Sequence, residues 1–472
     1  MSGWGSIYAN TIYALQKQST TIADLQRQIS TGMRVAQASD DPGSAVKIMN
    51  LQQKSTSCDT YMANLEQASM TLENSMNSIN QISTDLSRVR ELIAQATSGV
   101  YSDANRESMA AEVDALIEQA LSLVNTSSLG QYSFAGQTVT TTPYVAQREN
   151  GLITEVQYVG SLEEMYVPVT TETNFATQFV GEDVFSVFDP ERPIFEGVTG
   201  AAVGTSPSTV RGDVWLTVAD GGTTSYAAGP LAAGTSASQD TILGVHSISV
   251  DSAAMTVSLD GGPGASFTGT ENDLVVTNDA GETVHVDMTA WAGGDGQWDV
   301  SRSATLSLDN GVTTTTVTDF SQQASVVDPH TGGVLMVDPS GIVKADVEAI
   351  TVPGSYDLFG SLIHIRDLLA NTRDLDSSRQ QELLQQAGVS LSAVTDNLTQ
   401  ELSAVGSKIQ ALDSMTQTMK TNQNTVDDQT VMLQDADIVD VTLKIARSQN
   451  LYEMALTSAS KLLSLSLLDF IQ

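Results

Sequence analysis

Apolar residues recur every seven positions along the first thirty residues of the chain, with polar residues between them. A sustained seven-residue apolar repeat is typical of α-helices that pack side by side as coiled coils. The pattern therefore predicts one long helix with a single apolar seam. Its seam positions are Tyr8, Leu15, Ile22, Leu25 and Ile29.

The same repeat continues in two longer stretches, one before residue 100 and one after residue 380. A helix of about 50 residues extends about 75 Å, so helices of this length form a rod rather than a globule. We expect the seam side chains of the two stretches to be buried against facing helices. They are Leu65, Leu72, Ile79, Leu86 and Ile93 in the first stretch, and Leu391, Leu398, Val405 and Leu412 within the longer series from Leu384 to Leu433.

The last 35 residues form another periodic segment that is unusually rich in leucine. It offers more apolar surface than one partner helix can cover, and isolated helices in water are marginally stable. We therefore expect both chain ends to become ordered in a polymer, although an ordinary intramolecular helix pair is the simpler alternative. Besides the seam of the first helix, the predicted polymer contacts are Ile438, Ile445, Tyr452, Leu456, Leu462, Leu463, Leu467, Leu468, Phe470 and Ile471.

Local signals mark where these helices begin and end. Asp41 followed by Pro42 is typical of a helix start, because the carboxylate caps free N–H groups and proline suits the first turn. Gly32 stands where the preceding helix should end. Asp435 and Asp437 should cap the final helix, and capping is a better explanation for them than a metal site.

The middle of the chain has a different character. Residues 188–354 hold many short Val/Thr/Ser runs separated by Asp-Gly, Gly-Gly and Asn-Gly turns, which is typical of antiparallel β-structure. The helical zones on either side resemble each other in composition. We therefore predict a β-rich domain inserted between two helical chain ends that belong together.

Charge narrows the choice of partners. The chain has 21 Lys+Arg against 56 Asp+Glu, a net charge of −35, which disfavours nucleic acid and anionic membranes. Acid density is highest in residues 188–354, as expected for an exposed, soluble domain. The single cysteine, Cys58, excludes an internal disulfide. No apolar run is long enough for a membrane span, and no cleaved signal peptide is expected.

No pattern for catalysis or metal binding is present. The histidines His246, His285, His330 and His364 are scattered and form no H-E-x-x-H motif. No calcium loop of the EF-hand type occurs. The tripeptide 211–213 spells Arg-Gly-Asp, but it directly precedes a strand-like run. We therefore predict no enzyme activity, no cofactor and no metal site.

Several motifs resemble the flagellin superfamily. They are Gln28-Ile29-Ser30-Thr31-Gly32-Met33-Arg34-Val35 with Ser39-Asp40-Asp41-Pro42, then Leu86-Ser87-Arg88-Val89-Arg90-Glu91-Leu92-Ile93, then Tyr132-Ser133-Phe134-Ala135-Gly136, and Asp435-Ala436-Asp437. The ending Leu465-Ser466-Leu467-Leu468-Asp469-Phe470-Ile471 is similar to that of the hook–filament junction proteins, the hook-associated protein 3 (FlgL) group, rather than to that of flagellins.

The resemblance implies an α+β fold: a long coiled-coil-like helical rod built from both chain ends, a small β-hairpin region and an inserted, mainly-β outer domain. Residues 1–38 and 436–472 would form an inner terminal helical domain. Residues 39–187 and 355–435 would form the rod with the β-hairpin region. Residues 188–354 would form the outer domain.

The resemblance also implies a structural role at the hook–filament junction of the bacterial flagellum. The implied partners are further copies of the chain in a ring, the first hook-associated protein, flagellin and a flagellar export chaperone. The implied location is extracellular, on the flagellum, after export by the flagellar type III system without a cleaved signal peptide. Two other functions stay open: a flagellin, and an adhesin or carbohydrate-binding protein that binds through the β insertion.

Overall fold

The computed structural model describes residues 3–99, 101–128, 130–170, 172–329 and 331–471, and it describes side chains from residue 9 to residue 461 within those ranges. The described chain forms an α+β structure with long helices and a strand-rich region. It divides into two compact units. The terminal unit comprises residues 1–70, 167–175 and 409–472, and the central unit comprises residues 71–166 and 176–408.

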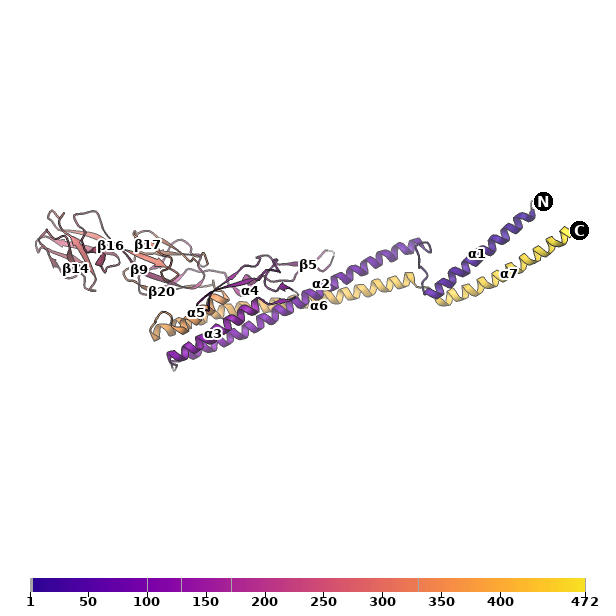
Figure 1. The fold of residues 1–472 in the computed structure, drawn as a ribbon, viewed down its shortest axis with the longest axis horizontal. Coiled ribbons are helices and arrows are strands. Elements are labelled where there is room, and N and C mark those ends of the chain that lie inside the picture. Colours follow the sequence, from indigo (N-terminus) through magenta and orange to yellow (C-terminus); the bar gives the residue numbers. More distant parts are fainter. Residues whose placement is uncertain (1–2, 100, 129, 171, 330, 472) are drawn as a thin grey trace. The chain divides into compact units, whose positions relative to one another are not determined.

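The helices account for both ends of the chain. Their bounds are α1 Gly3–Thr31, α2 Pro42–Ala96, α3 Asp103–Val124, α4 Gly181–Phe185, α5 Leu358–Ala370, α6 Ser377–Gln434 and α7 Ile438–Ile471. In the terminal unit α1 and α7 lie side by side (Figure 1) and run antiparallel, because Gln18 in the middle of α1 donates to the carbonyl oxygen of Ser448 near the middle of α7, while α1 ends where α7 begins.

Helix boundaries follow the local chemistry of the sequence. Asp41 Oδ1 accepts a hydrogen bond from Ser44 N at 3.1 Å at the start of α2. Asp437 Oδ1 accepts from Val439 N at 3.0 Å at the start of α7. Gly32 follows α1 with a φ of +72°, a left-handed conformation that favours glycine. These three predictions of helix ends are confirmed.

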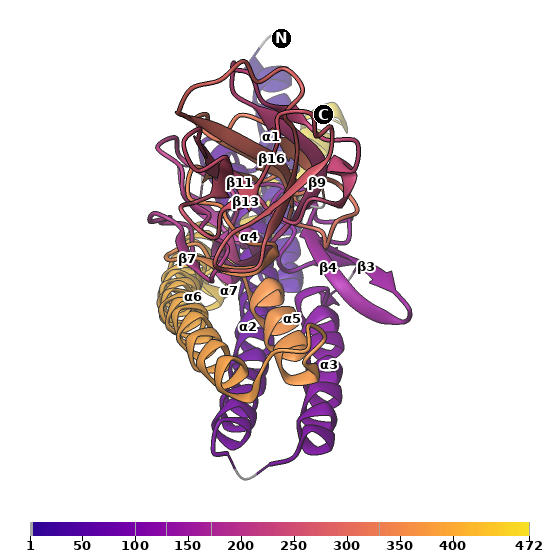
Figure 2. The same cartoon turned by 90° about the vertical axis from the view of Figure 1, so that its left-hand side faces the viewer.

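Helices α2 and α6 run antiparallel. In the terminal unit, Ser55 of α2 donates a hydrogen bond to Asp427 of α6. In the other direction, Gln423 of α6 donates to Asp59 of α2. In the central unit, a side chain added at Gly388 of α6 would contact Ile93 of α2. Helix α3 lies against α5, as Figure 2 shows, and Arg366 of α5 donates to Asp114 of α3 at 3.0 Å.

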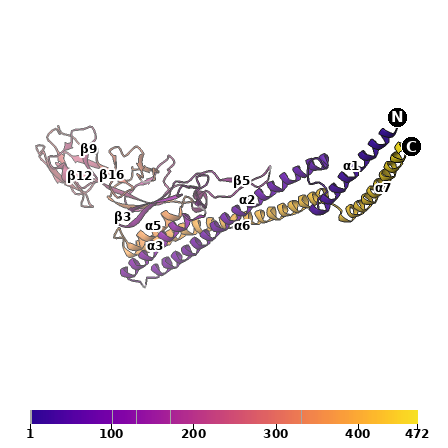
Figure 3. The ribbon, with the colours of Figure 1, turned by 45° about the vertical axis from the view of Figure 1, so that its right-hand side comes forward.

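Short strands lie beside this helical bundle. They are β1 Ser127–Ser128, β2 Gln131–Tyr132, β3 Tyr144–Glu149, β4 Leu152–Tyr158, β5 Tyr166–Pro168 and β6 Asn174–Ala176. β3, labelled in Figure 3, pairs with β4 in an antiparallel manner through the turn at Asn150 and Gly151. β4 contacts α5. Arg366 Nη1 also donates to the carbonyl oxygen of Ile153 at 2.7 Å, which fixes β4 to α5.

The strand-rich region begins after α4. Its strands are β7 Ile194–Glu196, β8 Ala202–Val203, β9 Gly212–Tyr226, β10 Ala232–Ala233, β11 Gly244–Asp251, β12 Thr256–Leu259, β13 Ala265–Ser266, β14 Leu274–Thr277, β15 Thr283–Asp287, β16 Gly296–Ser307, β17 Thr315–Val317, β18 Ala324–Val327, β19 Val334–Asp338 and β20 Asp346–Val352. The largest sheet has the order β13-β12-β11-β16-β9-β20-β7, with β17 paired to β16.

This region has two separate hydrophobic cores. One core contains Leu216, Leu306 and Ile350, and the other contains Ile248, Val284 and Val300. We call residues 194–220 and 304–352 the first lobe, and residues 221–303 the second lobe, from which Leu243 packs into the first core. The second lobe is therefore inserted within the first, between the two long strands β9 and β16 that both lobes share.

The boundary between the lobes is a break in the β9–β16 pairing. The register shifts between Arg302 and Ala304, opposite the segment from Asp220 to Thr224. A side chain on Gly221 would collide with the backbone of Ser303 at 2.9 Å, so the strands approach closely only because glycine is there. A bulge of this kind bends both strands and ends one core before the next begins.

Arg302 occupies this boundary and is 2% exposed. Its guanidinium donates to both carboxylate oxygens of Asp220 at 2.7 Å, and further to Thr224 Oγ1 and the carbonyl oxygen of Ala237. The hydrogen bonds from Arg302 hold the pKa of Asp220 below its usual value, although its burial opposes the shift. A bidentate pair of this kind, in which the arginine is buried, fixes the position of β16 relative to β9.

We predict that the second lobe can be removed without unfolding the first. Asp220 and Ala304 are direct neighbours across β9 and β16, so an Asn-Gly turn can replace residues 221–303. The shortened chain should keep cooperative unfolding of the first lobe, measured by circular dichroism and calorimetry, at a somewhat lower melting temperature because Leu243 leaves the first core. A matched deletion that joins Thr217 to Ser307 also removes Val218, Ala304 and Leu306 from that core and should lower the melting temperature much further. Equal melting temperatures for the two shortened chains would contradict the division into two cores.

A second prediction concerns Asp85, which is 7% exposed between α2 and α3. Its Oδ1 accepts from Gln81 and from Gln119 of α3, whereas its Oδ2 has no partner. Burial raises the pKa of Asp85 above its value in the unfolded chain. The charged form therefore costs stability at neutral pH, and that cost disappears as the pH falls toward about 4.

Asp85→Asn should accordingly stabilise the chain by about 1 kcal/mol at pH 7 and by progressively less toward pH 4. Thermal unfolding across this pH range measures the difference. Glu107→Gln, which neutralises an exposed carboxylate on the facing helix α3, is the control and should change nothing. A destabilised Asp85→Asn at pH 7 would show that the charge itself holds the helices together.

Candidate assembly surfaces

The pair formed by α1 and α7 buries one face of each helix. On α7 this face carries Val441, Ile445, Ser448 and Tyr452, of which Val441 and Ser448 are less than 9% exposed. On α1 it carries Leu15, Ile22 and Leu25, which are half-buried. These positions follow the seven-residue repeat of the sequence, so the repeat describes the contact between the two chain ends.

The opposite face of α7 carries three exposed apolar side chains, with Ala446, Arg447 and Asn450 between the second and the third. Val439 is 71% exposed, Leu443 66% and Met454 67%. Their spacing places them on one side of the helix, about 180° from the side that bears Ser448. We call Val439, Leu443 and Met454 the outer stripe. Exposed apolar side chains on the side of a helix away from its partner are positions where contact with another molecule would bury apolar area.

The predicted polymer contacts fall into three groups in the structure. Half-buried in the helix pair are Leu15, Ile22, Leu25, Ile445 and Tyr452, whereas Ile438, Leu456 and Ile29 are exposed by 46%, 52% and 38%. The remaining side chains lie outside those that the structure describes: Tyr8, Leu462, Leu463, Leu467, Leu468, Phe470 and Ile471. The sequence interpretation singled out one seam of α7 and missed the outer stripe, although a second apolar spacing of three and four residues could have indicated it.

The predicted rod seam is buried throughout. Every member is 6% exposed or less: Leu65, Leu72, Ile79, Leu86, Ile93, Leu391, Leu398, Val405 and Leu412. Leucine and isoleucine side chains contribute about 1.5–3 kcal/mol each when fully buried. The seam therefore supplies stability to the chain itself and is not available for contacts with partners.

Arg34 holds the segment that follows α1 against the C-terminal end of α6. The backbone N–H of Arg34 donates to the carbonyl oxygen of Gln434 at 2.7 Å, and its guanidinium donates to that of Leu433 at 2.8 Å. Arg34 also contacts Asp41, whose pKa is lowered to about 2 by hydrogen bonds from Ser44 and from Arg34. We call this cluster the Arg34 node. It fixes the two chain segments at the ends of α1 and α6.

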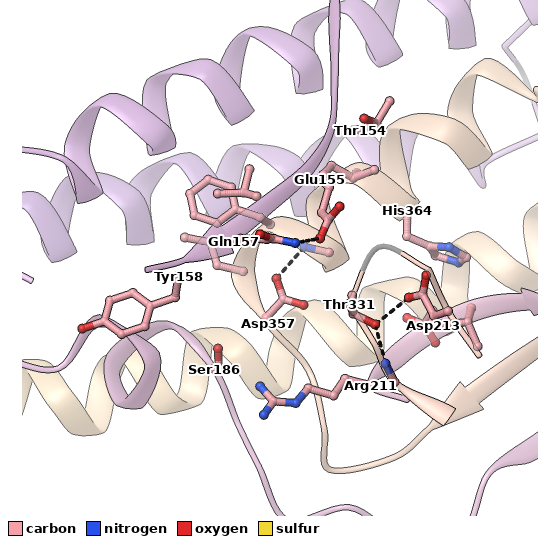
Figure 4. Close-up of a pocket in the computed structure, with 18 of the residues that line it drawn as sticks. Thr154, Glu155, Gln157, Tyr158, Ser186, Arg211, Asp213, Thr331, Asp357 and His364 are labelled. Carbon is pink, nitrogen blue, oxygen red and sulfur yellow. Dashed lines mark hydrogen bonds between the residues drawn. The ribbon is translucent and has the colours of Figure 1, made fainter. Parts of the chain in front are cut away.

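The central unit contains an open cavity of about 810 Å³ between β4, α4, the start of β9 and the N-terminus of α5. Figure 4 shows Asp357, Asp213 and Glu155 around it, together with a single labelled arginine, Arg211. Asp357 caps α5 by accepting from Gly360 N at 2.7 Å. Its burial raises its pKa.

Other groups at this cavity also serve the fold. The ring of His364 lies 5.8 Å from that of Trp215, and burial lowers the pKa of His364. Arg211 pairs with Glu182, and Asp213 accepts from Thr351 Oγ1 at 2.6 Å. The Arg-Gly-Asp tripeptide therefore lies at the start of strand β9, with both charged side chains bonded to neighbouring residues, and does not project as a loop.

Two of the histidines considered in the sequence analysis are paired with carboxylates of the β-rich region. His246 Nδ1 is 2.7 Å from Asp260, and His285 Nδ1 is 2.8 Å from Asp240. His330 lies outside the described residues. Over the residues that the structure describes, no group of three His, Cys, Asp or Glu side chains could hold a metal ion. None of the helices described is both long and apolar enough to cross a membrane.

Residues 6–138 match the family model described as the bacterial flagellin N-terminal helical region. The resemblance to the flagellin superfamily is thereby confirmed. The flagellar hook-associated protein 3 of Escherichia coli strain K12 is 29% identical over 159 residues, which cover 34% of this chain and 48% of that protein. A flagellin of Listeria monocytogenes is 24% identical over 126 residues, which cover 27% of this chain and 44% of that protein.

The chain thus spans about half the length of these curated relatives. Among solved structures, the flagellar hook-associated protein 3 of Legionella pneumophila matches 82% of this chain and 98% of its own, at 17% identity and a TM-score of 0.45. A likeness of that size carries no argument on function. Hook-associated protein 3 recurs among the curated relatives, in Escherichia coli and in Salmonella typhimurium.

The contrast between the outer stripe and the rod seam gives a prediction. Leu443→Asp should change the free energy of unfolding of the monomer by no more than about 0.5 kcal/mol, because the side chain is exposed. Leu398→Asp is the matched control at a buried position and should cost about 3–5 kcal/mol. Thermal unfolding of both purified variants measures the difference. A large loss in Leu443→Asp would mean that the outer stripe belongs to the core of the monomer.

Proposed function

We propose that the chain is a structural component of the bacterial flagellum that forms the junction between hook and filament. The observation that carries this proposal is the outer stripe on α7, in a chain whose N-terminal region resembles hook-associated protein 3. Apolar side chains that the helix pair leaves exposed would stabilise an assembly of many copies when neighbouring copies cover them. The chain would join further copies in a ring, with the first hook-associated protein on one side and flagellin on the other.

The distribution of charge supports this role. The terminal unit has 9 Lys+Arg and 14 Asp+Glu, whereas the central unit has 12 and 42. Helices α1 and α7 alone are nearly neutral, with five basic and four acidic residues. Copies can therefore associate through these helices without strong repulsion, while the acidic β-rich regions repel one another and stay apart.

The remaining expectations complete the proposal. Residues 1–38 with 436–472 would form the assembly domain, residues 39–187 with 355–435 a coiled-coil rod with a β-hairpin region, and residues 188–354 the outer domain. The chain would reach the cell exterior through the flagellar type III route with the help of an export chaperone. It would act without enzyme activity, cofactor or metal.

A flagellin function is the second candidate, favoured by the similarity to the flagellins of Listeria monocytogenes and Listeria innocua. Immunolabelling of intact flagella separates the two: a junction protein is confined to the boundary between hook and filament, whereas a flagellin labels the whole filament. An adhesin function through the β insertion lacks support from the Arg-Gly-Asp tripeptide, because Arg211 and Asp213 are engaged in the fold.

Assembly should depend on the outer stripe. Cells that lack the chain should release flagellin into the medium, and the wild-type chain should restore filaments. Leu443→Asp should fail to restore filaments and should leave flagellin in the medium, because each copy would bring a charge into an apolar contact. Leu443→Met should restore filaments and stop the release of flagellin. Immunoblots of the medium and electron microscopy provide the measurement. Normal filaments with Leu443→Asp would rule out α7 as the contact surface, and normal filaments in cells without the chain would rule out the junction role.

A further inference from the structure

Exposed methionines are concentrated in the terminal unit. Among the described side chains, the methionines on the surface are Met33, Met49, Met70, Met432 and Met454, with exposed fractions from 38% to 81%, and all five belong to that unit. In the central unit, Met109 is 7% exposed and Met288 is fully buried, and Met76, Met165, Met255 and Met336 are half-buried. The most exposed thioethers are therefore those of the terminal unit.

Three of these side chains belong to apolar surface. Met454 is a member of the outer stripe on α7. Met432, 81% exposed, follows the exposed Val431 near the end of α6, and Met49 lies one turn after the exposed Val46 at the start of α2. Methionine suits a contact surface because its flexible thioether adapts to different neighbours. The thioether is also the group in an apolar contact that mild oxidants attack most readily.

We propose that Met49, Met432 and Met454 are sites of oxidation that control assembly. A peroxide-class oxidant such as hydrogen peroxide transfers one oxygen atom: the sulfur lone pair attacks a peroxide oxygen, the O–O bond breaks, and the products are methionine sulfoxide and water. The sulfoxide is polar. When a neighbouring subunit covers it, its oxygen must be desolvated without a partner, which weakens the contact.

Met33 differs and provides an internal comparison. Its sulfur accepts a hydrogen bond from Gln434 Nε2 at 3.2 Å, next to the Arg34 node. A sulfoxide oxygen at Met33 can accept the same hydrogen bond, so oxidation there keeps a polar partner. We therefore expect Met33 to tolerate oxidation, and Met49, Met432 and Met454 to be the sensitive positions.

The first experiment measures reactivity on the intact monomer. The purified full chain is treated with limiting hydrogen peroxide, quenched, digested, and analysed by mass spectrometry for sulfoxide at each methionine. Met49, Met432 and Met454 should oxidise at least about tenfold faster than Met288 and Met109, because attack requires access to sulfur. Equal rates at exposed and buried positions would overturn the assignment.

The second experiment tests the consequence, and it rests on the proposed function. Glutamine imitates the polarity of the sulfoxide, so Met432→Gln with Met454→Gln should reduce filament restoration in cells lacking the chain by about tenfold or more. Met432→Leu with Met454→Leu should restore filaments and resist inhibition by peroxide. Met33→Gln should behave as wild type. Monomer melting should be unchanged in all three.

The outcomes separate this inference from the junction role. If cells without the chain still grow filaments, the junction role fails irrespective of the methionines. If the wild-type chain restores filaments and the double glutamine variant does so equally well, the junction role stands and the assignment of the oxidation sites is overturned. If the double leucine variant restores filaments but is inhibited by peroxide as strongly as wild type, the sensitive group lies elsewhere and the inference also fails.

Discussion

A helix pair can bury only one face of each helix, and this limit governs the terminal unit. Val441 and Ser448 of α7 are buried on the side that contacts α1, whereas Val439 and Leu443 on the opposite side have no covering element. Exposed apolar surface of this kind is unfavourable in water at about 25 cal/mol per Å². Association with another molecule removes that cost, so the geometry of the pair itself favours a larger assembly.

The limit also explains the chemistry of the surface. A contact that forms only on assembly must be apolar enough to bind and adaptable enough to fit a neighbour, and the exposed methionines meet both conditions. The acidic β-rich region then restricts where association occurs, because like charges repel in every arrangement that brings two such regions together. Attraction and repulsion are thus assigned to different units of one chain.

The regular features of this structure follow from the sequence, because they depend on local period and local caps. The repeat from Leu65 to Ile93 predicts a buried helix face, and Asp437 predicts the start of α7, since both signals act within one or two turns. The outer stripe was missed because exposure depends on which partner a helix has. The unpaired Oδ2 of Asp85 was missed for the same reason, since its surroundings come from α3.

The two lobes of the β-rich region mark another limit of the sequence. Turn signals such as Asp309-Asn310-Gly311 occur in both parts of residues 188–354, so composition does not separate them. The division arises at a single break in β9 and β16, where Gly221 allows a close approach and Arg302 binds Asp220. That boundary depends on pairing across about eighty residues of chain, which a local pattern cannot register.

The way in which the insertion joins the helical part explains how one chain can hold both. The chain enters and leaves the insertion side by side, because Val187 N donates to the carbonyl oxygen of Tyr356 and Asp189 N to that of Gly354, each at 2.7 Å. A segment whose ends already meet adds little loop-closure entropy to the fold that carries it, even when it is long. The second lobe repeats this arrangement within the first, with paired strands at its base. Each level of the structure can therefore fold around its own core, and the outermost parts can change in length without disturbing the helices on which assembly depends.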